Sequence, residues 1–155
     1  MSATTADSTA SHKKVAMRFY DDLLNEGNFA LVHELMTPDF VNHTNGSGLE
    51  GFVAFARNMH EAFPGLRFTV EDLFGEGDRI AVRWRMDGVH QGVFLGNSPT
   101  GKPVVNRANV IFGFRGDRIS DLWIQFDGIG FLKQLGGLPE NFGTPAAPQQ
   151  ASAAN

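Results

Sequence analysis

The chain has 155 residues, a length that favours one domain with a sizeable core. Hydrophobic residues make up 42% of it and charged residues 19%, which is typical of a soluble globular protein. The net charge is −4 and no long run of like charge occurs, so no basic surface for binding nucleic acid is expected. The chain has no cysteine, which excludes disulfides, thiolate catalysis and cysteine zinc sites. It has neither a signal-peptide core nor an apolar run of the roughly 20 residues that cross a bilayer, so we predict a cytoplasmic protein without membrane contact.

The first half of the sequence predicts helices. Residues 1–10 are small and polar and are expected to form a flexible tail, and Ser11 is a candidate N-cap for a helix that Gly27 ends. One face of this helix carries apolar residues at helical spacing: Val15, Phe19, Leu23 and Leu24. A short helix near residues 28–36 is expected to stop at Pro38.

A short extended piece over residues 40–43 is expected next, and Ser47 then caps a third helix over residues 48–63. The apolar face of that helix follows helical spacing: Phe52, Phe55, Met59 and Phe63. Pro64 and Gly65 end it.

The second half predicts an antiparallel meander of long strands. Apolar and polar residues alternate with period two, and glycine-containing turns separate the strands. The expected strands cover residues 66–74, 80–87, 104–114 and 119–126, and a last helix covers residues 129–136. Asp127 is a candidate N-cap for that helix. Helices followed by strands indicate an α+β domain over residues 11–138, with a loose tail over residues 139–155.

Strand parity separates the two faces of this sheet. In the last two strands the apolar sets that should face the core are Ala108, Val110, Phe112 and Phe114, and Leu122, Ile124 and Phe126. The opposite face carries Arg107, Asn109, Trp123 and Gln125. An outward tryptophan beside arginine and glutamine is typical of a protein interface, so we predict a homodimer; the alternative is that Trp123 only covers the sheet.

Four stretches resemble the SnoaL-like polyketide cyclases, including the branch often called ester cyclases. These stretches are FYDDLLNEGNFALVHELMTPDFVNH at residues 19–43, AFPGLRFTVEDLFGEGDRIAVRW at residues 62–84, GVHQGVFLGNSPTGK at residues 88–102, and RISDLWIQFDGIGFLKQLG at residues 118–136. They occur in the family's order and spacing over residues 11–138. The resemblance implies the NTF2-like fold, a cone in which a curved antiparallel sheet and N-terminal helices enclose a pocket, and it implies a homodimer through the outer sheet face.

The family's cyclases close a polyketide ring by an aldol step that uses an Asp on the last long strand and a His on the strand before it. Aligned on the turn and the QLG end, the Asp position falls on Ile124 and the His position on Val110. Both side chains are apolar here, so the resemblance implies the family's pocket without its acid–base pair.

His90 is the leading candidate for the chemistry that remains. It continues the inward parity of Trp84 and Met86, and Gly88 and Gly92 are expected to leave room beside it for a ligand. A neutral imidazole there is expected to act as a general base. The alternative is a structural histidine, satisfied by hydrogen bonds, beside a strand bulge.

His43 and Tyr20 are the other candidate catalytic residues. His43 ends the extended piece near the expected pocket mouth, and Tyr20 lies on the first helix, whose inner face should border the pocket; either is expected to polarise a carbonyl group. The alternatives are a surface loop histidine for His43 and a core aromatic with its hydroxyl at the surface for Tyr20. The expected pocket lining is Asn42, Phe55, Met59, Trp84, Met86, Val110, Phe112 and Ile124. No histidine spacing fits a metal site, so no metal or other cofactor is predicted.

Three functions fit these residues: a cyclase, isomerase or hydrolase acting on an apolar carbonyl compound, a module that binds a small hydrophobic molecule without chemistry, and a scaffold dimer with a filled interior. The NTF2-like fold hosts all three, so the fold alone does not choose among them.

Overall fold

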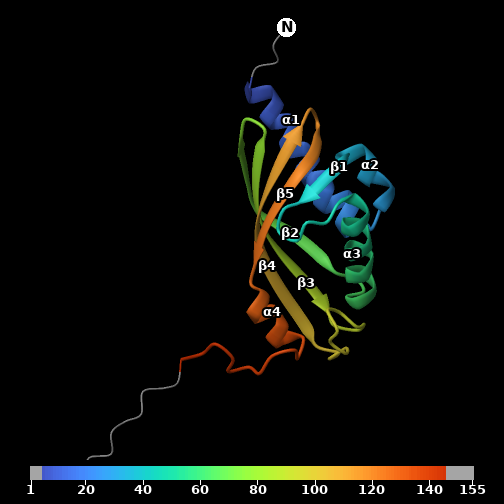
Figure 1. The fold of residues 1–155 in the computed structure, drawn as a ribbon, viewed down its shortest axis with the longest axis vertical. Coiled ribbons are helices and arrows are strands. Elements are labelled where there is room, and N and C mark those ends of the chain that lie inside the picture. Colours follow the sequence, from blue (N-terminus) through green and yellow to red (C-terminus); the bar gives the residue numbers. More distant parts are fainter. Residues whose placement is uncertain (1–4, 146–155) are drawn as a thin grey trace, which may run out of the picture.

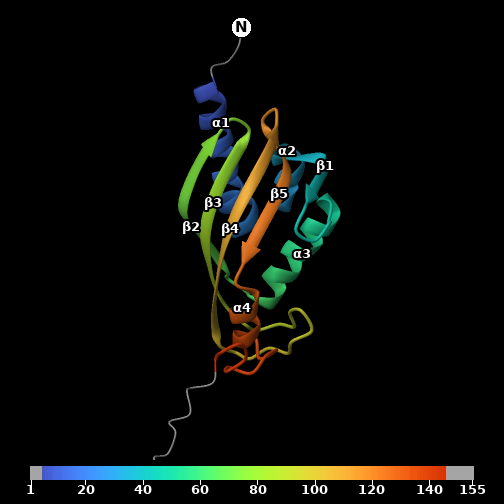
Figure 2. The same ribbon diagram turned by 60° about the vertical axis from the view of Figure 1, so that its left-hand side comes forward.

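The structure is a computed structural model that describes residues 5–145, so residues 1–4 and 146–155 of the two expected tails lie outside it. It is an α+β domain in which one curved sheet, with strand order β1-β5-β4-β3-β2, carries the long helices on a single face (Figures 1 and 2). The predicted fold class is therefore confirmed. No helix among the described residues is long and apolar enough to cross a membrane.

The first helix is longer than the sequence pattern predicted. α1 spans Thr5–Arg18 and runs directly into a π-helical segment, η1, over Phe19–Asn25. Ser11 is therefore an interior residue of α1 and not its N-cap. Next to it, His12 stacks on Phe114 with ring centroids 4.2 Å apart and donates from Nε2 to the carbonyl oxygen of Gly116 at 2.8 Å. These two contacts hold α1 against the turn at residues 115–117.

The middle of the chain forms short elements and one long helix. A 3-10 turn, η2 (Phe29–Leu31), leads into α2 (Val32–Leu35) and strand β1 (Met36–Asn42), and α3 covers Leu49–Ala62. Gly27, with φ of 67°, ends the first helical segment as predicted. The N-cap of α3 is Gly48, without a side-chain bond, so the prediction of a Ser47 cap is wrong. The carbonyl oxygen of Ser47 instead accepts the N–H of Asn42 at 2.8 Å and closes the turn after β1.

The four long strands follow the predicted meander. They are β2 (Arg67–Glu76), β3 (Arg79–Val89), β4 (Pro103–Arg115) and β5 (Arg118–Phe126), each antiparallel to the next, and α4 covers Gly128–Gln134. The side chain of Asp127 accepts the N–H of Gly130 at 2.8 Å, which confirms it as the N-cap of α4. β1 is the exception to the meander, because it pairs in parallel with β5 at the sheet edge.

A bulge in β5 sets which face each of its side chains occupies. Gly113 pairs with Asp121 and Phe114 pairs with Ile119, so Ser120 is the extra residue. Because of it, Ile119 and Leu122 both face the core, whereas Asp121 faces outward. Leu122 and Ile124 of the predicted inward set face the core after this bulge, whereas Phe126 at the end of β5 is 45% exposed.

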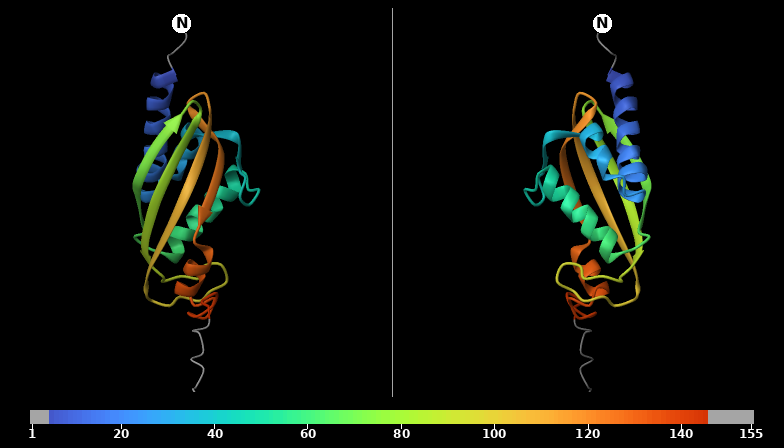
Figure 3. Two further views of the ribbon diagram at one scale, coloured as in Figure 1. Left: turned by 90° about the vertical axis from the view of Figure 1, so that its left-hand side faces the viewer. Right: turned by 90° about the vertical axis from the view of Figure 1, so that its right-hand side faces the viewer.

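The core lies between the inner sheet face and α1, η1 and α3, as the two side views show (Figure 3). It is rich in aromatic rings, and Phe19, Tyr20, Phe40, Phe63 and Phe112 are at most 2% exposed. The N-terminal part of α1 lies near one end of the strands, and α4 with the β3–β4 loop lies at the other (Figure 1). Gln134 of α4 bonds both the N–H and the carbonyl oxygen of Val105 at 2.8 Å, which fixes α4 to β4.

Candidate functional site

His90 lies in the interior at the end of β3 and is fully buried. Its ring packs on Phe63, with centroids 5.5 Å apart, and Phe63 in turn contacts Phe94 and Phe131. Its backbone closes the β3–β4 loop: the N–H of His90 donates to the carbonyl oxygen of Lys102 at 2.9 Å, and its carbonyl oxygen accepts the N–H of Gly101 at 2.8 Å. One histidine thus lies beneath an aromatic cluster at the α4 end of the cone.

The sequence predicted that the glycines beside His90 leave space for a ligand, but other parts of the chain fill that space. A Cβ atom at Gly92 would lie 2.8 Å from the carbonyl oxygen of Glu61, and one at Gly88 would lie 3.1 Å from Cβ of Phe63. The N–H groups of Gln91 and Gly92 both donate to the carbonyl oxygen of Ala62, at 2.9 and 3.0 Å. Glycine is therefore needed because the end of α3 packs directly against this loop.

Only one of the two ring nitrogens of His90 has hydrogen-bond partners. Its Nδ1 accepts the backbone N–H of Thr100 at 3.2 Å and lies 3.3 Å from the hydroxyl of the same residue. Its Nε2 is buried and has no partner among the described residues. A buried polar atom without a partner costs free energy, and such atoms in folded proteins mark sites of bound water or ions, of catalysis or of strain. Thr100 carried no signal in the sequence, because only loop closure brings it to His90.

Tyr20 lies in the interior at a different level of the sheet. It is 1% exposed, and burial raises its pKa well above the usual value, whereas a hydrogen bond from Trp84 lowers that pKa to a smaller extent. Trp84 lies six residues before His90 on β3, and a strand rises about 3.3 Å per residue. Tyr20 and His90 therefore lie too far apart to contact the same ligand atom.

The two positions that the resemblance aligned with the His and Asp of the cyclases meet in the interior. Val110 and Ile124 are directly paired across β4 and β5, and both face the core, where Val110 is 2% exposed. Trp84, Met86 and Phe112 are also buried, and Met59 and Ile124 are partly exposed. Phe55 is 46% exposed, and its ring packs on Phe94 from the flank of α3, with centroids 5.6 Å apart.

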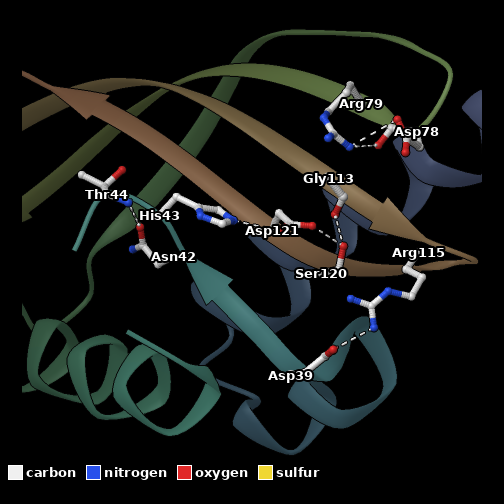
Figure 4. A network of polar contacts seen from close by, with 10 residues as sticks. All are labelled: Asp39, Asn42, His43, Thr44, Asp78, Arg79, Gly113, Arg115, Ser120 and Asp121. Atoms are coloured by element: carbon white, nitrogen blue, oxygen red, sulfur yellow. Dashed lines mark hydrogen bonds and ion pairs between the residues drawn. The ribbon is translucent and has the colours of Figure 1, made fainter. Parts of the chain in front are cut away.

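His43 lies on the outer face of the sheet instead of in the interior (Figure 4). Its ring stacks on Trp123 with centroids 4.6 Å apart, and its Nε2 lies 2.7 Å from Oδ1 of Asp121. Ser120 donates to the other carboxylate oxygen of Asp121 at 2.5 Å. The bonds from His43 and Ser120 hold the pKa of Asp121 below its usual range. The sequence predicted that His43 faces the pocket. That prediction relied on strand alternation, which no longer applies because His43 is the first residue after β1.

Asn42 belongs to the same turn as His43 and has a local structural role. Its side-chain oxygen accepts the N–H of Thr44 at 2.9 Å, and its carbonyl oxygen accepts the N–H of Gly46 at 2.8 Å. The hydroxyl of Thr44 accepts the N–H of Ile124 at 2.9 Å and ties this turn to β5. The structure therefore places the three candidate catalytic residues in three separate environments.

A hollow of about 500 Å³ lies on the outer face of the sheet. Its lining is Phe74, Gly75, Glu76, Arg79, Ala81, Ile111 and Trp123. Phe74 is 65% exposed and Ile111 46%, and the guanidinium of Arg79 lies 5.2 Å from the Trp123 ring centroid. A second hollow of about 350 Å³ lies between α1 and the strand turns, and His12 and Phe114 contribute to it. Neither of these two is lined by His90 or Tyr20.

Comparisons with known proteins agree with this architecture. Among solved structures, AclR from Streptomyces galilaeus, a candidate hydroxylase, superposes with a TM-score of 0.77 at 26% identity, covering 86% of this chain and 89% of AclR. A candidate SnoaL-like polyketide cyclase from Jannaschia sp. CCS1 gives 0.77 at 25% identity, over 90% of this chain and 99% of that one. IdmH from Streptomyces antibioticus, a candidate polyketide cyclase, gives 0.70 at 28% identity, over 81% and 98%.

A comparison with curated proteins finds no match. The family profile described as SnoaL-like polyketide cyclase matches residues 14–135, from α1 to the residue that follows α4. Because this match covers most of the chain, and because the solved relatives share its cone of sheet and helices, the protein belongs to the SnoaL-like polyketide cyclase family.

Proposed function

We propose that this protein binds a small, largely apolar carbonyl compound between the inner sheet face and the helices, with His90 as the polar contact. The observation that carries the proposal is the unpartnered, fully buried Nε2 of His90 beside the Phe63 ring. A ligand oxygen at this nitrogen would remove the cost of the unpaired atom. Aromatic side chains around a single polar group suit a ligand that is apolar apart from one oxygen.

The family's aldol step is not proposed for this chain. Val110 and Ile124 occupy the positions that resemble the cyclases' His and Asp, and neither side chain exchanges protons. Polarisation of a carbonyl group by His90 or Tyr20 is the chemistry that the interior offers. Binding, with or without a polarisation step, is therefore the function that the interior residues support best. The cytoplasmic location stays a prediction.

Ligand-dependent melting tests the binding proposal. We expect apolar ketones and esters to raise the melting temperature of the native protein, and we expect His90→Phe to abolish most of this shift. The stability of the ligand-free variant should change by less than about 1 kcal/mol, because the lost Thr100 bond and the removed unpaired Nε2 have opposite effects of similar size. His33→Phe, at an exposed histidine of α2, is the control. An unchanged ligand shift in His90→Phe would contradict the proposal.

A methyl-ester polyketide intermediate tests the chemistry separately. We expect no rapid cyclisation of this compound. Fast cyclisation that survives the combined His90→Ala and His43→Ala substitutions would mean that the catalytic residues lie elsewhere in the chain.

We also propose that the protein is a homodimer that pairs through the outer sheet face. Three exposed apolar side chains on that face, Phe74, Ile111 and Trp123, line one hollow. Exposed apolar patches with polar rims are typical of protein interfaces. A scaffold dimer without an interior ligand is the second candidate function, and this surface is the observation that favours it.

A further inference from the structure

The β3–β4 loop brings two hydrogen-bond donors of one residue to the same nitrogen of His90. The backbone N–H of Thr100 lies 3.2 Å from Nδ1, and a backbone N–H can only donate. The hydroxyl oxygen of Thr100 lies 3.3 Å from Nδ1 and accepts the N–H of Lys102 at 3.2 Å. Its own proton is therefore free to point at Nδ1.

These contacts define the protonation pattern of the neutral ring. Nδ1 must carry the lone pair that receives the bond from Thr100, so the ring proton lies on Nε2. The two backbone bonds that join His90 to Lys102 and Gly101 keep the ring and Thr100 in register. His90 therefore presents a donor to the interior, whereas the sequence suggested a general base.

We infer that Thr100 is a positioning residue that fixes His90 as a hydrogen-bond donor and so restricts the interior site to ligands with an uncharged acceptor, such as the carbonyl oxygen of a ketone or ester. The inference rests on the proposed binding function and makes it more specific. A ligand whose buried polar group can only donate has no lone pair to accept the bond from the Nε2–H of His90, so two donors would face each other. Such mismatches in a buried site cost more than a missing contact does.

The tautomer is tested first, without any ligand. In protein labelled with ¹⁵N at histidine, the His90 signals are assigned by their loss in His90→Gln. At a pH where the ring is neutral, we expect Nε2 to show the shift of a protonated nitrogen and Nδ1 that of a nitrogen with a lone pair. The reverse pattern would overturn the inference and leave the binding proposal standing.

Two substitutions separate the donors of Thr100. Thr100→Val removes the hydroxyl and keeps the backbone N–H, so we expect it to retain the Nε2–H tautomer. Thr100→Pro removes both donors, and we expect the two tautomers to become mixed. If Thr100→Pro does not fold, the Thr100→Val and native spectra still decide the assignment. A tautomer ratio that is unaltered in folded Thr100→Pro would show that Thr100 has no positioning role.

The ligand class is tested with an isosteric pair, an aryl alkyl ketone and the hydrocarbon in which a methylidene group replaces the carbonyl oxygen. We expect the native protein to bind the ketone roughly 3- to 10-fold more tightly, the ratio that one neutral hydrogen bond supplies. This ratio should fall to about one in His90→Phe. Equal affinity of the native protein for both compounds would overturn the specificity, and the absence of binding by either would overturn the proposed function as well.

Discussion

Asp121 and His43 meet at 2.7 Å on the face of the sheet opposite to His90 (Figure 4). The resemblance to cyclases implied an Asp on the last long strand acting with a His inside the cone. This chain has an Asp–His contact on that strand, but it lies outside, where His43 also stacks on Trp123. The interior positions hold Val110 and Ile124 instead. The contact therefore belongs to the surface proposed for dimerisation and not to the interior.

Asp121 makes the protein less stable in acid. Its pKa is held down by His43 and Ser120 in the folded state, and an unfolded Asp titrates near about 3.9. The stabilisation is therefore complete above this value and is lost as the pH falls through the lower folded-state pKa. We expect Asp121→Asn to cost about 0.5 kcal/mol at about pH 6 and less at about pH 3, measured by urea unfolding. Asp117→Asn, at the turn before β5, is the control, and an equal cost at both pH values would contradict the assignment.

A charge on the outer face should dissociate the proposed dimer. In the variant Ile111→Asp, a carboxylate replaces a side chain that is 46% exposed and lies beside Trp123 in the hollow. We expect the native protein to sediment as a dimer at micromolar concentration and Ile111→Asp to sediment as a folded monomer, because two copies would bury the charge. Ala54→Asp, on the exposed side of α3, should remain dimeric. A native protein that sediments only as a monomer would rule out the proposal.

The periodicity of apolar residues and the residue types of the turns were enough to predict most of the fold. The strand alternation from Ile80 to Met86 placed β3 correctly, and Gly27 and Asp127 ended and capped helices where expected. These signals are local, so one sequence suffices to read them. The start of α1 was missed because residues 5–10 are small and mostly polar, so no apolar period marks the part of the helix before Ser11.

The candidate site was less predictable because its contacts are not local. Strand parity placed His90 inward, but Thr100 reaches it only through the closure of the β3–β4 loop. Gly92 suggested empty space in the sequence and instead marks the approach of α3. His43 follows the last residue of β1, so no period determined its face. Each miss concerns a loop or a packing contact, and neither has a repeating sequence signal.

The single tyrosine of the chain gives a direct probe of the interior. Burial raises the pKa of Tyr20 well above about 10, the value expected in the unfolded chain. Folding stability should therefore fall as the pH rises above about 10, because only the unfolded chain releases this proton. We expect tyrosinate absorbance to appear together with the loss of circular dichroism. Ionisation of Tyr20 near about pH 10 in a fully folded protein would show that the hydroxyl is open to solvent.

Gly92→Ala should destabilise the fold at the junction of α3 and the β3–β4 loop. The added Cβ atom would lie 2.8 Å from the carbonyl oxygen of Glu61 and 3.0 Å from Cα of Ala62, and neither backbone atom yields easily. We expect a loss of about 1–3 kcal/mol in the free energy of urea unfolding. Gly128→Ala, whose Cβ would lie 3.5 Å from the Phe126 ring, is the control and should change stability little. Similar values for the two variants would contradict this packing.

The extra residue Ser120 also has an evolutionary consequence. Ile119 faces the core on one side of it, and Asp121 faces outward on the other. Loss of the Ser120 codon would place inward Ile119 directly before outward Asp121, which is regular strand alternation. The bulge would disappear, and Leu122 and Ile124 would keep their inward faces while Asp121 and Trp123 stayed outside. The bulge can therefore be lost in a single in-frame deletion without exposing the apolar face of β5.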